Sequence, residues 1–139
     1  MNEDQQLELF EDEQDLIDQA AFDYRDTRPS SLVFMGRCIS VTYIEEGPWG
    51  SDVFGDFYAK EQRIRILEDL KPIEEMDTFL HEVIHMIMNY MTIMMGQVDE
   101  EMITHRLATG LSSVLVENPH VADYIAAISA TSTTDLTEE

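Results

Sequence analysis

The spacing of apolar positions divides the chain into an extended first half and a helical second half. Residues 31–46, SLVFMGRCISVTYIEE, are rich in β-branched and aromatic side chains, which favours one or two strands. Residues 53–67, VFGDFYAKEQRIRIL, favour two more, and the alternation of arginine and isoleucine over 63–66 indicates a half-exposed edge strand. The intervening EGPWGSD has the composition of a turn or loop.

From residue 72 onward, apolar positions recur at helical intervals. Pro72 suits the first turn of a helix, and Gly96 is expected to end it. The apolar face of this helix is expected to centre near Ile84. Two further helices are expected at 99–116 and 119–128. Strands followed by helices predict an α+β domain.

The charge distribution indicates which partners are disfavoured and where the domain begins and ends. The chain of 139 residues has 29 acidic and 8 basic side chains, for a formal charge of −21. This balance argues against binding nucleic acid or an anionic membrane, but it would suit a protein that imitates a nucleic acid. The acidic segment 1–28 is expected to be disordered or partly helical, and 131–139 to be a disordered polar tail. Residues 29–130 are the expected domain.

The single cysteine, Cys38, excludes an internal disulfide bond and favours a reducing, cytoplasmic compartment. Its position on a predicted strand, without a nearby base in the sequence, leads us to expect a buried and inert thiol. No apolar run approaches the roughly 20 residues that a membrane span needs. An intracellular protein without a membrane segment is therefore expected.

The helix that begins at Pro72 contains the sequence HEVIH, with His81, Glu82 and His85. Residues four apart lie on one face of a helix, about 5–6 Å from each other, so both imidazoles can reach one Zn²⁺. The residue after the first histidine lies roughly 100° round the helix, where its carboxylate can contact a metal-bound water without being a ligand. The pattern therefore predicts a zinc site with Glu82 as general base.

A zinc site with an open position needs a third protein ligand, for which the next helix offers Glu100, Glu101 and His105. The apolar face of that helix is expected to comprise Ile103, Leu107, Leu111 and Val114. Glu100 falls near the middle of this face, whereas Glu101 lies about 90° from it. Because the histidines are expected at the flank of the helix contact, Glu101 is preferred, with Glu100 as the alternative. His105 is expected to orient a ligand rather than to be one.

The motifs DTFLHEVIHMI, DEEMITHRLATGL and ENP together resemble the small zincin-fold metallopeptidase-like proteins of bacteriophages and prophages, and more distantly the gluzincins. The resemblance covers about residues 60–128. It implies a minimal zincin fold: a short, mainly antiparallel sheet, an active-site helix and a ligand-bearing helix. It also implies Zn²⁺ held by His81, His85 and a glutamate, with Glu82 as base. On this pattern the strand QRIRIL would hold an extended peptide by strand addition.

The expected function is therefore zinc-dependent hydrolysis of a peptide bond in a protein or peptide substrate. Such an enzyme also needs a donor for the oxyanion. The sequence does not choose among the candidates, which are Tyr58, Tyr90, His105 and His120.

Two other functions use the same residues differently. The chain could be an inert, zinc-stabilised interaction protein, or an acidic DNA mimic that inhibits a host protein. Near the N-terminus, QLELF resembles the short peptide with which bacterial proteins dock onto the replicative sliding clamp. In that interpretation Gln6, Leu7, Leu9 and Phe10 would bind the clamp.

Overall fold

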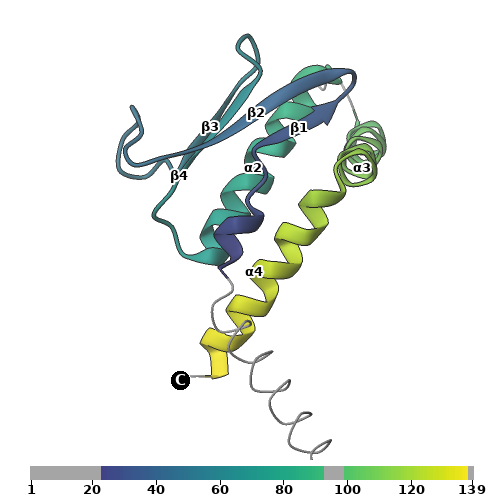
Figure 1. Cartoon of the computed structure of the whole chain (residues 1–139). Coiled ribbons are helices and arrows are strands. Elements are labelled where there is room, and N and C mark those ends of the chain that lie inside the picture. Colours follow the sequence, from purple (N-terminus) through teal and green to yellow (C-terminus); the bar gives the residue numbers. More distant parts are fainter. Residues whose placement is uncertain (1–22, 93–98, 138–139) are drawn as a thin grey trace, which may run out of the picture.

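The computed structural model describes residues 23–92 and 99–137, with side chains through residue 131. The clamp-like segment QLELF and the expected helix end at Gly96 lie outside the described residues. The elements, in chain order, are η1 (Tyr24–Thr27), β1 (Ser31–Phe34), β2 (Arg37–Ile44), β3 (Gly55–Tyr58), β4 (Arg63–Leu67), α2 (Pro72–Tyr90), α3 (Glu100–Glu117) and α4 (Pro119–Thr137). The α+β class is confirmed, with the strands preceding the long helices (Figure 1).

The four strands form one mixed sheet in the order β1-β2-β4-β3. The β1–β2 and β3–β4 pairs are antiparallel, and the central β2–β4 pair is parallel. β4 is therefore an interior strand, and the prediction that 63–66 forms an edge was wrong. The alternation of arginine and isoleucine indicates only that one face of the strand is exposed. An interior strand also has an exposed face when one side of the sheet is open. β3 is the edge strand on this side.

One face of the sheet forms the core with the helices. Its inward side chains are Leu32, Phe34, Ile39, Val41, Ile64 and Ile66, all buried. The opposite face is open, and Cys38 lies there because it precedes the inward Ile39 in a strand whose side chains alternate. Cys38 is exposed, so the expected buried thiol was wrong.

α2 lies across the inner face of the sheet (Figure 1). Its most deeply buried apolar side chains are Phe79, Val83, Met86 and Ile87. Ile84 is 37% exposed, so the expected centre of the apolar face was wrong. The sheet covers the side of the helix that carries Phe79 and Val83, and Ile84 lies about 100° from Val83. The helix ends at Tyr90, earlier than expected, and Met91 and Thr92 form a turn.

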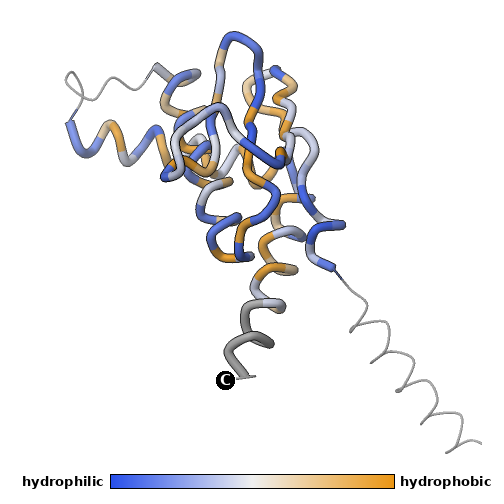
Figure 2. Tube along the Cα trace, turned by 90° about the vertical axis from the view of Figure 1, so that its left-hand side faces the viewer, coloured by the Kyte–Doolittle hydropathy of each residue, from blue (hydrophilic) through white to orange (hydrophobic). Residues whose placement is uncertain are grey.

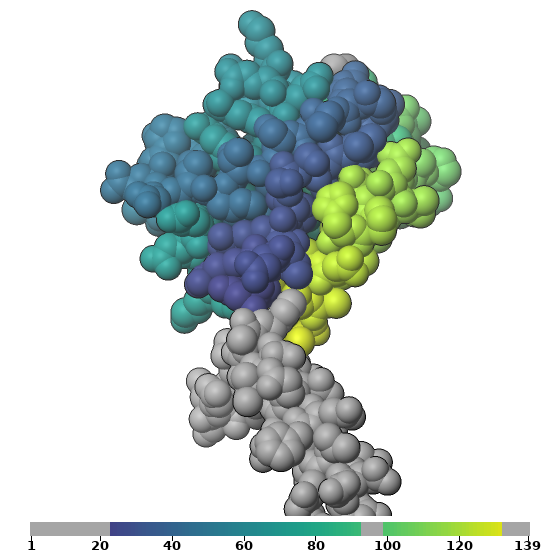
Figure 3. Space-filling model, viewed as in Figure 1, coloured from purple at the N-terminus to yellow at the C-terminus, as the bar shows by residue number. Residues whose placement is uncertain are grey.

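The two ends of the described chain meet on one side of the domain. α4 runs to Thr137 rather than ending at Ile128, and thus enters the segment expected to be a polar tail. η1 lies beside α4 (Figure 3), and its Tyr24 is 5% exposed within the core. The packed domain therefore includes residues before 29. None of the described helices is long and apolar enough to cross a membrane.

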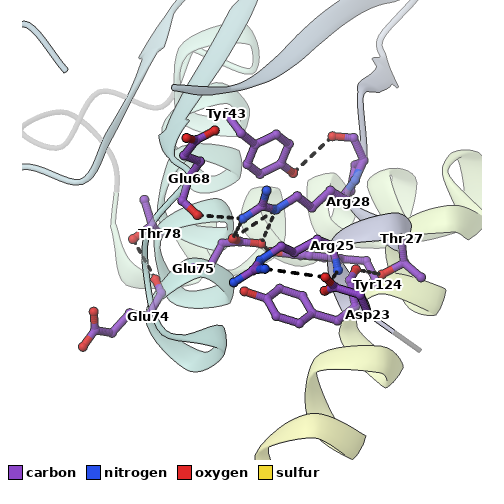
Figure 4. Close-up of polar contacts among 12 residues, drawn as sticks. Asp23, Arg25, Thr27, Arg28, Tyr43, Glu68, Glu74, Glu75, Thr78 and Tyr124 are labelled. Carbon is purple, nitrogen blue, oxygen red and sulfur yellow. Dashed lines mark hydrogen bonds and ion pairs between the residues drawn. The ribbon is translucent and has the colours of Figure 1, made fainter. Parts of the chain in front are cut away.

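A buried carboxylate fixes the start of α2. Glu75 is fully buried, and the guanidinium of Arg28 donates to both of its oxygens (Figure 4). Arg28 also donates to the carbonyl of Glu68 at 2.9 Å, just before the helix. Tyr124 of α4 donates its hydroxyl hydrogen to the same carboxylate. α2 is thus tied to the N-terminal segment and to α4.

Candidate metal centre

The two histidines of the motif converge. His81 and His85 lie on the exposed side of α2, and their Nε2 atoms are 3.1 Å apart. Two nitrogens bound tetrahedrally to one zinc, each at about 2.0–2.1 Å, would be roughly 3.3 Å apart. The pair therefore has the separation of two ligands of a shared metal. Two neutral rings, one donating to the other, have a similar separation.

Glu82 lies beside the histidines but points deeper. It is 5% exposed, and within the described part of the chain its carboxylate has no hydrogen bond or ion pair. Burial raises the pKa of Glu82, the positive form of His81 lowers it, and the charge of Asp56 raises it further. A carboxylate whose pKa is raised toward neutrality, next to two imidazoles, is suited to proton transfer.

A groove runs between α2 and the edge strand β3. It consists of two adjoining hollows, of about 410 and 260 Å³, which share Gly55, His81 and Glu82 as lining residues. Gly55 permits the close approach of the strand to the helix. A Cβ atom there would lie 2.7 Å from the Arg65 carbonyl oxygen and 2.9 Å from Thr78 Cγ2.

The outer edge of β3 borders this groove. Within the described part of the chain β3 pairs with β4 alone, and Leu67 N–H donates to the Phe54 carbonyl at the start of the pairing. In an antiparallel ladder the hydrogen-bonded positions alternate, so the backbone N–H and C=O groups of Gly55 and Phe57 are directed away from β4. These groups offer an extended peptide a place to pair beside the histidines.

The third-ligand candidates lie elsewhere. Glu100, Glu101 and His105 are exposed on the first turns of α3. This end of the helix projects from the rest of the domain (Figure 2). No group of three His, Cys, Asp or Glu side chains suited to a metal forms within 23–92 and 99–131. The side chains of Ile103, Leu107, Leu111 and Val114 do face the core, as expected. The structure thus brings His81, Glu82 and His85 together, but not the glutamates of α3.

The residues considered as oxyanion donors lie outside the groove. Tyr90 donates its hydroxyl hydrogen to the Ala59 carbonyl at 3.0 Å, and its ring packs against Phe57. His120 has Nε2 2.8 Å from the Ser31 carbonyl, on α4. Neither lines the groove beside the histidines, and nor does Tyr58.

A second polar cluster holds the edge strand. Asp56 accepts hydrogen bonds from Arg65 Nε at 3.0 Å and Nη2 at 2.6 Å, and from Trp49 Nε1 at 3.1 Å. The Arg65 hydrogen bonds hold the pKa of Asp56 below its ordinary value, with a smaller contribution from Trp49. The sequence prediction missed β3 as a wall of the site, although a glycine in a short strand is a known sign of close approach.

Comparisons with protein-family models, with curated proteins and with solved structures found no match to this chain. Function must therefore be inferred from the residues themselves. Two exposed imidazoles at the separation of metal ligands and a buried carboxylate beside them form the most chemically specific group in the described part of the chain. The donor set fits zinc at two of the three protein positions that an open catalytic site requires.

Proposed function

We propose that this protein is a zinc-dependent peptidase of minimal zincin type, in which His81 and His85 hold the metal and Glu82 is the general base. The observation that carries the proposal is the 3.1 Å separation of the two Nε2 atoms on the open side of α2. The resemblance of HEVIH and the following EE to phage zincins supports the same function. A zinc bound there would polarise the scissile carbonyl and lower the pKa of its bound water.

The side chains have distinct tasks. His81 and His85 must be neutral to donate their nitrogen lone pairs to the metal. Glu82 would take a proton from the attacking water and return it to the leaving amine. Its raised pKa brings this carboxylate closer to the range in which both transfers are efficient.

The free edge of β3 is the proposed substrate site. An extended peptide would pair with the outward backbone groups of Gly55 and Phe57, which would carry its scissile bond past His81 and Glu82. This assignment replaces QRIRIL, because β4 lies inside the sheet.

We retain Glu101 as the proposed third ligand, with Glu100 as the alternative. Both stand in the first turn of α3, directly after the undescribed 93–98. For either carboxylate to complete the site, the first turns of α3 must lie closer to the histidines than they do here. His105, one turn beyond Glu101, is proposed to orient that ligand.

Metal analysis tests the centre. The purified protein should carry about one zinc per chain, and His81→Ala and His85→Ala should lose it. Glu101→Ala should weaken zinc binding more than Glu100→Ala, and His120→Ala, a histidine outside the groove, should leave it unchanged. A folded native protein that takes up no zinc would contradict the proposal.

Turnover is tested separately. Glu82→Gln should keep the zinc and the fold but lose hydrolysis of unfolded protein substrates, by a factor of about 10²–10⁴. Equal activity in the variant would remove Glu82 from the mechanism. Zinc binding without any Glu82-dependent hydrolysis would favour the inert interaction protein.

A further inference from the structure

One end of the groove is acidic and has no counter-charge among the described residues that line it. Beyond His81 the groove continues into the smaller hollow, whose described lining residues include Asp52 and Asp77 but no lysine or arginine. Both aspartates are exposed, and neither has an ion pair or a hydrogen bond within the described residues. In this they differ from Asp56 at the other end, whose charge is neutralised by Arg65.

The buried Glu82 lies between the two ends and independently indicates a ligand. This side chain is 95% buried, given its exposure of 5%, and lines both hollows without a partner among the described residues. An unpartnered carboxylate in such a position carries a desolvation penalty that a bound cationic group would relieve. Three residues with carboxylates, Asp52, Asp77 and Glu82, therefore line one hollow.

The walls of the hollow specify the kind of cation. Val53 and Phe54 also line it and are 42% and 39% exposed. Lysine and arginine side chains pack their aliphatic stems on apolar surface while the charged head reaches polar partners. The ring of Phe54 can add a cation–π contact. A small hydrated metal ion would gain nothing from these apolar walls.

We propose that this end of the groove binds a lysine or arginine side chain of the substrate, so that the protein acts on basic peptides near a cationic residue. The proposal deepens the proposed function, on which it rests for the peptide nature of the ligand. The formal charge of −21 supports it, because a strongly acidic protein attracts basic partners from solution.

Binding of short peptides to His85→Ala, which should hold no zinc and keeps all three carboxylates, tests the site without turnover. A peptide with a central lysine should bind about 10-fold more tightly than the same peptide with norleucine, which keeps the four-carbon chain but lacks the ammonium group. Adding Asp52→Asn or Asp77→Asn should reduce this preference about 3-fold each, and the pair of changes should abolish it. Asp123→Asn, an exposed aspartate on α4 outside the groove, is the matched control and should leave it unchanged.

Salt should reduce the lysine preference, because charge pairs near the surface are screened. Equal affinities for the two peptides, or a preference that survives the double aspartate change, would overturn the proposed cation site.

Cleavage of a peptide mixture by the native protein then separates the two proposals. Enrichment of lysine or arginine at one position beside the cleaved bonds, lost in the double aspartate variant, supports both. Cleavage without such enrichment would overturn the cation site and keep the peptidase. A lysine preference in binding with no cleavage of any peptide would overturn the peptidase and keep the cation site.

Discussion

The hydroxyl of Tyr124 donates a hydrogen bond of 2.7 Å to Oε2 of Glu75, a carboxylate that is fully buried at the start of α2. Arg28, which lies between η1 and β1, supplies the positive charge that compensates this carboxylate. Three segments that are distant in the chain thus meet at one carboxylate (Figure 4). Because α2 also carries His81 and Glu82, this junction fixes the helix on which the proposed chemistry depends.

Tyr124→Phe should lower the free energy of unfolding by about 1.5–3 kcal/mol, because a buried carboxylate loses one of its donors. Glu75→Ala should lower it by about 3–5 kcal/mol, since it leaves Arg28 half-buried without its partner. Urea denaturation measures both changes. Tyr58→Phe, whose ring is exposed, is the control and should change little. Equal stability of Tyr124→Phe and the native protein would show that this hydrogen bond contributes nothing.

Gly110→Ala should destabilise the contact between α3 and α2. In an exposed helix interior this change usually stabilises by about 1 kcal/mol. Here a Cβ atom would lie 2.5 Å from Ile87 Cγ2 and 3.2 Å from the Met91 sulfur, so the helices must separate. The net effect should be a loss of about 1–3 kcal/mol in unfolding free energy. Ser112→Ala, exposed on the same helix, is the control, and a stabilised Gly110→Ala would contradict the close packing.

The starts of the helices were predictable because they depend on local signals, whereas the ends of α2 and α4 were not. Pro72 begins α2, and Asp99 caps α3, with its carboxylate accepting from Met102 N–H at 2.8 Å. The strand order was not predictable. Ile64 and Ile66 identify the buried face of β4, but their alternation does not indicate which strands pair with it.

Of the candidate site, the sequence could predict only the residues that lie on one helix. Helical spacing placed His81 and His85 together, since both lie on one element. The wall opposite them comes from β3, whose approach depends on tertiary packing at Gly55. The burial of Glu75 was equally hidden, because the neighbouring Glu74 is exposed and only the packing of α4 and Arg28 distinguishes the two carboxylates.

Zinc should raise the thermal stability of the native protein. A ligand that binds only the folded state stabilises it by about 2.7 kcal/mol at a free concentration of 100 times its Kd. Thermal unfolding with added zinc, and again after chelation, should show this increase and its loss. His85→Ala should show no increase, whereas His120→Ala should respond like the native protein. An equal response in His85→Ala would place the metal elsewhere.

Asp56→Asn should remove a pH-dependent part of the stability. The Arg65 and Trp49 hydrogen bonds lower the pKa of Asp56 in the folded state, so its carboxylate stabilises the fold above the unfolded pKa of about 3.9. This stabilisation is lost as the pH falls through the lower, folded pKa. Because Arg65 and Asp56 are only partly buried, we expect the native protein to exceed the variant by about 1 kcal/mol at pH 6.

Urea denaturation of both proteins from pH 6 down to about pH 3 measures this difference, which should shrink below roughly pH 4. Asp52→Asn, at an exposed aspartate without an ion pair among the described residues, is the control and should leave the unfolding free energy nearly unchanged. A constant difference between native protein and Asp56→Asn over the whole range would mean that the asparagine alters packing rather than charge. The cluster of Asp56, Arg65 and Trp49 would then hold β3 beside the histidines by shape alone.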